Sequence, residues 1–142
     1  PQCLTVCYVM REEDVDMALT HPSVMLGSDG LLDQGQGHPR AAGAFPRFLS
    51  KYARTGKIGL YEAVAKMTAL PARRLGLTQK GRLSVGADAD IVLLRYTSIR
   101  DNASFQHPTL PPDGIDTVLI GGETALEGGR VVNRRLGRAI RL

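Results

Sequence analysis

Tryptophan is absent from this 142-residue sequence, and aromatic residues make up only 5% of it. We therefore expect a core built mainly from Leu, Val, Ile and Ala, whose side chains bury less area than aromatic ones. Long apolar runs are also missing. The apolar run 91–94 has four residues and the longest uninterrupted one, 6–10, has five, whereas a membrane-spanning helix needs roughly 18. No charged-then-apolar leader is present either, so the sequence predicts a cytoplasmic protein without a membrane segment.

Cysteine is scarce as well, with Cys3 and Cys7 the two examples. A zinc site would need further ligands at zinc-finger spacing, and none follow. We expect ordinary thiols in a reducing compartment, with a regulatory disulfide as the alternative. The remaining composition, 43% hydrophobic and 23% charged, is that of a globular domain and argues against disorder, a collagen-like repeat or a disulfide scaffold.

The net charge of +4 is unevenly distributed along the chain. Residues 1–50 carry −3, residues 51–100 carry +7, and residues 101–142 are balanced. A basic middle is compatible with binding phosphate backbones. However, no aromatic platform for stacking bases is interleaved with these charges. We interpret the basic region as a solvated face and expect no nucleic-acid partner.

The first half of the chain has the pattern of an α/β protein. An apolar, β-branched strand over 4–10, a short helix over 12–20 and a second strand over 24–28 predict a parallel βαβ unit. A glycine-containing loop over 30–44 follows. Further helices are predicted over 45–54, 60–70 and 72–75, and in the second Leu60, Val64, Met67 and Leu70 share one apolar stripe.

The pattern changes from helical to β near Gly81. A buried strand is expected over 91–94 and an irregular segment over 97–115. Strands over 116–120 and 124–126 flank Gly121-Gly122, a pair suited to a type I′ turn, and Gly128-Gly129 makes another turn before 130–132. We therefore predict two parts, residues 1–80 and residues 81–142.

Asp29 is the sharpest candidate for chemistry. It follows the predicted strand 24–28 and lies between Ser28 and Gly30. A carboxylate at the carboxyl end of a buried strand can bind a metal ion or accept a proton, and the adjacent glycine lets a ligand approach the backbone. The alternative is an ordinary Asx-turn or helix cap, because Ser-Asp-Gly is a common turn sequence.

The triplet His38-Pro39-Arg40 lies in the same loop, with Arg40 eleven residues after Asp29. A guanidinium grips a carboxylate through two parallel charge-assisted bonds, so Arg40 is a candidate substrate-binding residue. A solvated arginine and a structural histidine are the alternatives.

Several motifs together resemble the carboxyl-terminal part of the D-aminoacylases, the N-acyl-D-amino-acid deacylases of the amidohydrolase superfamily. They are VMLGSDG at 24–30, HPR at 38–40, FPR at 45–47 and EAVAKMTALPA at 62–72. The later stretch GRLSVGADADIV at 81–92, with the two Gly-Gly turns, resembles the closing β segment of that superfamily. The resemblance spans nearly the whole sequence in order and spacing.

This resemblance implies the end of a metal-dependent TIM barrel followed by a small β-sandwich segment. Residues 4–10 and 24–28 would be the last two barrel strands. Zinc in the intact enzyme would polarise the amide and acidify a bound water. Asp29 would be the catalytic base and then acid, and the one candidate metal ligand in this sequence. Arg40 would hold the substrate's α-carboxylate, with Ser28, Gly30 and His38 also lining the substrate site.

The sequence also departs from that pattern. The family's remaining metal ligands are expected upstream of the first predicted strand, and neither Cys3 nor Cys7 replaces them. Ala42-Gly43 stands where relatives often carry Tyr-Gly. We expect this chain alone to be inactive. It would pack against a missing amino-terminal part or form a homo-oligomer, since lone barrel strands expose their edges.

Two other functions remain open on the sequence. The chain fits a cyclic-amide amidohydrolase of the dihydroorotase or hydantoinase type, because the acid after a barrel strand and the closing β segment are common to both. It also fits a non-catalytic fragment used as an interaction module, for which the basic middle is the main argument. The two Pro-Arg triplets favour the deacylases, which act on small N-acyl-D-amino acids.

Overall fold

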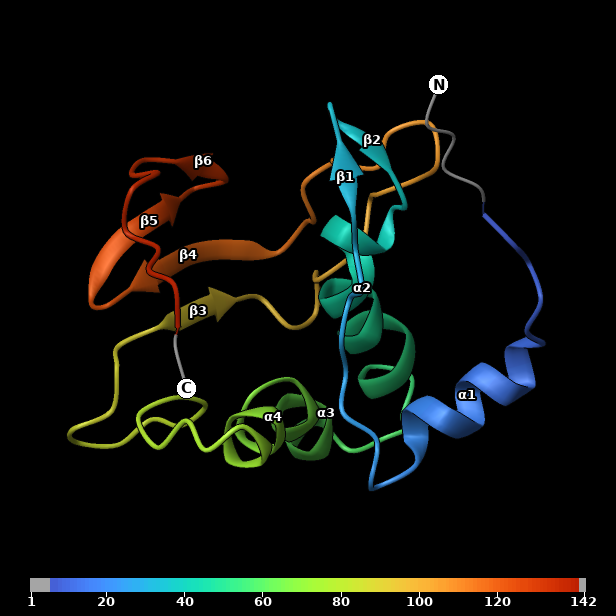
Figure 1. Cartoon of the computed structure of the whole chain (residues 1–142), viewed down its shortest axis with the longest axis horizontal. Helices are drawn as coiled ribbons and strands as arrows, with labels where there is room; N and C mark the ends of the chain where they lie inside the picture. Colours follow the sequence, from blue (N-terminus) through green and yellow to red (C-terminus); the bar gives the residue numbers. More distant parts are fainter. Residues whose placement is uncertain (1–5, 141–142) are drawn as a thin grey trace.

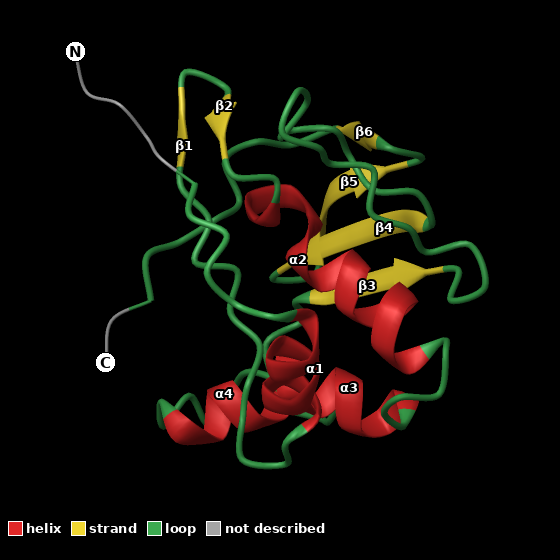
Figure 2. Cartoon of the chain, turned by 90° about the vertical axis from the view of Figure 1, so that its right-hand side faces the viewer, coloured by secondary structure: helices red, strands yellow, loops and turns green. Residues whose placement is uncertain are grey.

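The structure is a computed structural model and describes residues 6–140. Helices gather on one side of the molecule, and an antiparallel sheet lies beside them (Figures 1 and 2). In chain order the helices are α1 (Glu12–Thr20), α2 (Arg40–Phe48), a π-helical turn η1 (Leu49–Ala53), α3 (Leu60–Met67) and α4 (Ala69–Arg74). The strands are β1 (Leu32–Asp33), β2 (Gln36–Gly37), β3 (Ile91–Leu94), β4 (Ile115–Ile120), β5 (Glu123–Glu127) and β6 (Arg130–Val131).

The four-stranded sheet has the order β3-β4-β5-β6, and all neighbours are antiparallel. Gly121 and Gly122, with φ of 59° and 85°, form the turn between β4 and β5. Positive φ at both positions is the requirement of a type I′ turn, which confirms that prediction. Asp90, just before β3, accepts a hydrogen bond from the Gly121 amide at 2.8 Å and so helps to hold the turn.

The two expected barrel strands are not strands in the described residues. Residues 6–10 and 24–28 pair with no other strand, so the parallel βαβ unit is wrong here. Tyr8 and Val9 are more than 80% exposed. A parallel strand is stable only when neighbours satisfy its backbone on both edges and cover its faces. The part of the chain that the structure describes supplies no such neighbours, and positions 4–5 lie outside it.

The helices differ from the prediction in their limits. The predicted loop 30–44 holds the β1–β2 hairpin and the start of α2, five residues earlier than expected. The predicted helix 60–70 breaks at Thr68. Pro71 explains the break: it has no N–H, and its ring clashes with the carbonyl four residues back, at the end of α3. Pro71 is tolerated instead in the first turn of α4.

The buried core is small and lies among the helices. Its fully buried members are Phe48, Leu49, Tyr52, Ala53, Ile58, Ala63 and Ile99. Five of these seven are Leu, Ile or Ala, as expected, and Phe48 and Tyr52 add an aromatic pair with centroids 5.3 Å apart. Ile99 comes from the irregular segment before β4 and joins that segment to the helices.

The buried face of α3 coincides only partly with the predicted apolar stripe. Leu60 and Val64 are exposed, whereas Ala63 and Lys66 are buried. Of the other two members of the predicted stripe, Met67 packs against the core and Leu70 is half-buried, so the stripe is only partly covered. Similarly, Val92 and Leu93 in the middle of β3 are about half exposed, although a buried strand was expected there.

Candidate functional site

Asp29 and Arg40 are brought together by the fold. Arg40 is the first residue of α2, and its side chain reaches back to the turn that contains Asp29. Its Nη2 donates to Asp29 Oδ2 at 2.8 Å, and its Nε donates to the Asp29 backbone carbonyl at 2.9 Å. One guanidinium therefore fixes both the side chain and the backbone of Asp29, as the fork geometry of arginine allows.

The backbone at Asp29 has an unusual conformation. Its φ is 45°, in the left-handed region that favours glycine, although Asp and Asn enter it more readily than other residues. Such residues cost free energy and cluster at functional sites. Asp29 makes no Asx-turn of the kind considered from the sequence. It is Ser28 that forms the local turn bond, since its Oγ accepts from the Gly30 amide at 3.4 Å.

Gly30 serves close packing in this structure. A Cβ at Gly30 would overlap Ala41 in the first turn of α2. The absence of a side chain thus lets α2 approach the turn closely enough for Arg40 to reach Asp29. The position that a Cβ would take at Gly30 is filled by Ala41.

His38 lies beside the pair and orients the start of α2. Its Nδ1 accepts a hydrogen bond from the Arg40 amide at 3.1 Å. Its ring meets Phe105 edge to face, with centroids 5.1 Å apart. Burial, and then the positive charge of Arg40, lower the pKa of His38. Both effects favour the neutral ring, which is the form that can accept this hydrogen bond.

Phe105 and Asp101 were not anticipated at this site. Phe105 belongs to the irregular segment 97–115, and besides His38 it contacts Tyr8, with centroids 6.0 Å apart. Asp101, 11% exposed, pairs with Arg47 at 3.8 Å and lies directly against Gly43 of α2. Phe105 thus supplies an aromatic ring beside His38. No periodicity marks an irregular segment, so pattern alone gave no signal.

The electrostatics of the pair are those of an open site. The Asp29 side chain is 91% exposed and that of Arg40 is 44% exposed. Water and solutes can therefore reach the carboxylate, while the ion pair itself adds only about 0–1 kcal/mol of stability.

A metal site is not assembled by these residues alone. No group of three His, Cys, Asp or Glu side chains gathers anywhere in residues 6–140. Asp29 is the one predicted ligand, and its carboxylate is paired with Arg40. A tetrahedral catalytic zinc needs about three protein ligands, so the described residues do not fit the metal without others.

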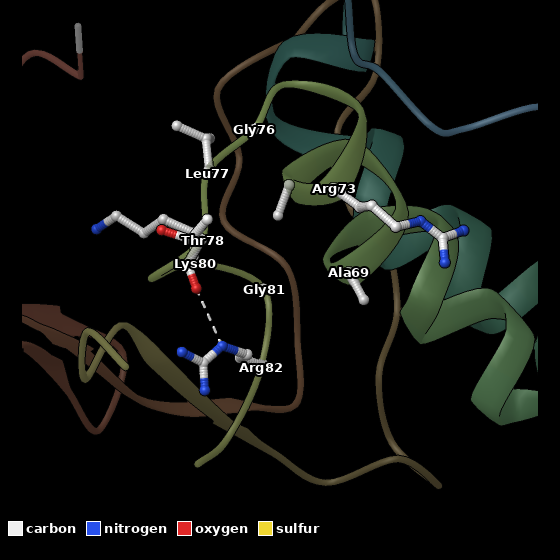
Figure 3. A pocket seen from close by; sticks show the side chains of 9 residues that line it. Ala69, Arg73, Gly76, Leu77, Thr78, Lys80, Gly81 and Arg82 are labelled. Atoms are coloured by element: carbon white, nitrogen blue, oxygen red, sulfur yellow. Dashed lines mark hydrogen bonds between the residues drawn. The ribbon is translucent and has the colours of Figure 1, made fainter. Parts of the chain in front are cut away.

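The described residues also contain hollows away from Asp29. One of about 310 Å³ lies between α4 and the following turns, with Arg73, Lys80 and Arg82 at its rim. Figure 3 shows Arg73 and Lys80 pointing away from each other, and Arg82 bonded to the Thr78 carbonyl. The three positive charges do not converge on one point, so this hollow is not a candidate active site.

No helix in the described residues is long and apolar enough to cross a membrane.

Comparison with known proteins decides the family. The amidohydrolase family profile matches residues 13–126, most of the chain and the whole region of the Asp29–Arg40 pair. The chain belongs to the amidohydrolase family. N-acyl-D-glutamate deacylase of Alcaligenes xylosoxydans xylosoxydans is 44% identical over 118 residues, which cover 82% of this chain and 24% of that enzyme.

Two solved structures are also similar. A D-aminoacylase structure described for its binuclear metal centre matches with a TM-score of 0.86 and 38% identity, covering 91% of this chain and 27% of that one. The N-acyl-D-glutamate deacylase of Bordetella bronchiseptica, complexed with zinc and a phosphonate inhibitor, matches with a TM-score of 0.78 and 39% identity, covering 87% and 28%. The amidohydrolase chain described here thus spans about a quarter of the length of these relatives.

Proposed function

We propose that this chain is the carboxyl-terminal portion of a metal-dependent hydrolase that cleaves the linear amide of N-acyl-D-amino acids. The similar proteins that carry this activity in their names match most of the chain at 38–44% identity. This agreement favours the deacylases over cyclic-amide hydrolases and over a non-catalytic module.

Arg40 would bind the free carboxylate of the substrate. In the described structure its guanidinium already holds a carboxylate, that of Asp29, which is the single observation that carries the proposal. A substrate carboxylate would compete for the same fork, and its arrival would release Asp29 from the ion pair. Binding of the correct substrate and liberation of the catalytic carboxylate would then be one event.

Asp29 would move the proton. A freed carboxylate can accept a proton from the attacking water and pass it to the leaving amine, first as a base and then as an acid. Its exposure leaves it accessible to both groups, and the bond from Arg40 Nε to its backbone holds it in place. His38 would keep Arg40 at the start of α2, and Ser28 and Gly30 would shape the turn.

Zinc would belong to the intact enzyme, as in the zinc complex of the Bordetella bronchiseptica relative. Asp29 is the candidate ligand in this chain, and most ligands would come from the part of the relatives that this chain does not span. Residues 1–80 would complete a TIM barrel against that part, and residues 81–142 would form the closing β segment. The unpaired segments 6–10 and 24–28 would gain their strand partners there.

The proposal is tested by Asp29→Ala in the full-length enzyme. Turnover of N-acyl-D-amino acids should fall by about 100-fold or more, since general acid–base catalysis contributes roughly 10²–10⁴. Asp33→Ala, on the exposed strand β1, is the matched control and should keep normal turnover. Near-normal turnover of Asp29→Ala would contradict the proposal, and preferential hydrolysis of cyclic ureides by the wild type would favour the alternative.

A further inference from the structure

Lys66 is a buried charge that the proposed chemistry does not use. It lies in the last turn of α3 and is 1% exposed, and it is the one charged side chain that is fully buried among residues 6–140. Burying an ammonium is costly unless hydrogen bonds compensate for the lost water. A side chain of similar size without charge, such as Met, would fill the same volume at no such cost. The charge at this position therefore calls for a reason.

The reason lies in what the ammonium contacts. Lys66 Nζ donates to the backbone carbonyls of His21 and of Val24, the latter at 2.8 Å. The Leu26 amide donates in turn to the Lys66 carbonyl at 3.1 Å. One residue of α3 thus makes three hydrogen bonds to the segment 21–26. This segment pairs with no strand, so Lys66 supplies the donors that a neighbouring strand would supply in a sheet.

The segment 21–26 leads directly into the candidate site. Leu26 and Asp29 are three residues apart, at most about 11 Å of extended chain. Beyond Asp29, the Arg40 side chain holds the Asp29 carbonyl from α2. The turn that carries the carboxylate is therefore anchored on both sides, by Lys66 from α3 and by Arg40 from α2.

We propose that Lys66 is a positioning residue that fixes segment 21–26 and thereby the location of the Asp29 carboxylate. This inference rests on the proposed function in assigning Asp29 to the reaction. Lys66 does not hold Arg40, which α2 positions separately. Loss of the ammonium should therefore disturb the proton-transfer step while leaving binding of the substrate carboxylate intact.

The test is Lys66→Met in the full-length enzyme, compared with Ala63→Gly as the matched control. Ala63 is also fully buried on α3, so its change destabilises the same helix without removing a bond to segment 21–26. We expect kcat of Lys66→Met to fall by about 10- to 100-fold, as small misplacements of catalytic groups do. KM should stay within about twofold, and Ala63→Gly should keep its kcat at temperatures below its own unfolding.

Amide hydrogen exchange gives a readout that does not depend on activity. Peptides covering 21–29 should exchange faster in Lys66→Met than in Ala63→Gly, with peptides of α2 unchanged between the two. Lys66→Gln, which keeps one donor group, should give intermediate exchange and kcat, and it decides the matter if the Met variant does not fold. Equal exchange and equal kcat loss in the Lys66 and Ala63 variants would overturn the positioning role.

Failure of the proposed function is separately visible. A wild-type enzyme that hydrolyses no N-acyl-D-amino acid would overturn that function, and with it the link from Lys66 to catalysis. The effect of Lys66 on segment 21–29 would still be measured, because the hydrogen-exchange comparison does not depend on activity.

Discussion

The carboxylate of Asp29 stands on a backbone conformation that costs energy, at a turn held by Arg40. Two hydrogen bonds from the Arg40 guanidinium stabilise this conformation. Arg40 reaches the turn because Gly30 has no side chain to keep α2 away. Each residue of this small set therefore supports another: Gly30 admits α2, α2 places Arg40, and Arg40 holds Asp29. Changes at any of them should be felt at the carboxylate.

Arg40→Ala in the full-length enzyme should raise KM for N-acyl-D-amino acids by about 10-fold or more. Hydrogen bonds to charged groups contribute about 1.5–3 kcal/mol each, and two of them are available to a bidentate carboxylate. A substrate whose carboxylate is blocked as an amide serves as the comparison and should be affected much less. Equal losses on both substrates in steady-state kinetics would contradict the assigned role.

Gly43→Ala should destabilise the fold by about 1–3 kcal/mol, the usual cost of overpacking. A Cβ at Gly43 would overlap the Asp101 carboxylate, which is nearly buried and accepts a hydrogen bond from the Ala103 amide at 2.9 Å. Gly137→Ala, where the added methyl meets open space, is the control. Denaturant unfolding measures both, and equal midpoints would show that Asp101 moves aside freely.

At the scale of elements, polar contacts attach α1 to the π-helical turn η1 and to Lys57, which follows that turn. Asp16 on α1 accepts a hydrogen bond from the Tyr52 hydroxyl at 2.6 Å and pairs with Lys57, while Glu12 pairs with Lys51. Burial, and then the bond to Asp16, raise the pKa of Tyr52, so it stays a donor throughout the ordinary pH range. α1 itself has no fully buried residue, and these polar contacts add to the packing of half-buried Leu19 against the core.

Acid should therefore release α1. The bonds from Lys57 and Tyr52 hold the pKa of Asp16 below its usual 3.8. A lowered pKa stabilises the folded state at pH values above the usual one, and this contribution is lost as the pH falls through the lowered value. Asp16→Asn should thus be less stable than wild type at pH 7, with the difference shrinking below about pH 3.8.

The measurement is the free energy of unfolding of both proteins across that pH range. Asp14→Asn, whose residue pairs with the exposed Arg11 on the same helix at 3.5 Å, provides the control and should show a smaller difference at pH 7. A wild-type advantage over Asp16→Asn that persists unchanged to pH 2 would contradict the assignment.

For the whole molecule, the sequence predicted the helices and turns whose formation depends on residues close to them along the chain. The helix 12–20 and the Gly-Gly turns are confirmed because an acidic first turn and positive φ are local requirements. The pattern places Asp29 and Arg40 in one loop but does not predict the ion pair between them. What failed depends on distant neighbours: 24–28 is no strand without flanking strands, and α3 turns Lys66 rather than Leu60 inward. No local pattern encodes such partners.

The isolated 142-residue chain should hydrolyse no N-acyl-D-amino acid, with or without added zinc. Its described residues gather no three metal-binding side chains, and Asp29 is occupied by Arg40. The comparison is the full-length enzyme at equal molar concentration in the same assay. Zinc-stimulated turnover by the isolated chain would show that its own residues suffice.

Of the four lysines that the structure describes, Lys66 alone has its amine sealed from water, whereas Lys51, Lys57 and Lys80 keep a quarter or more of their side chains exposed. Acylating reagents attack only amines they can touch. Chemical labelling of the native protein should therefore modify Lys51, Lys57 and Lys80 readily. Lys66 should react only when the segment that covers it opens locally, so its labelling rate measures how often that opening occurs.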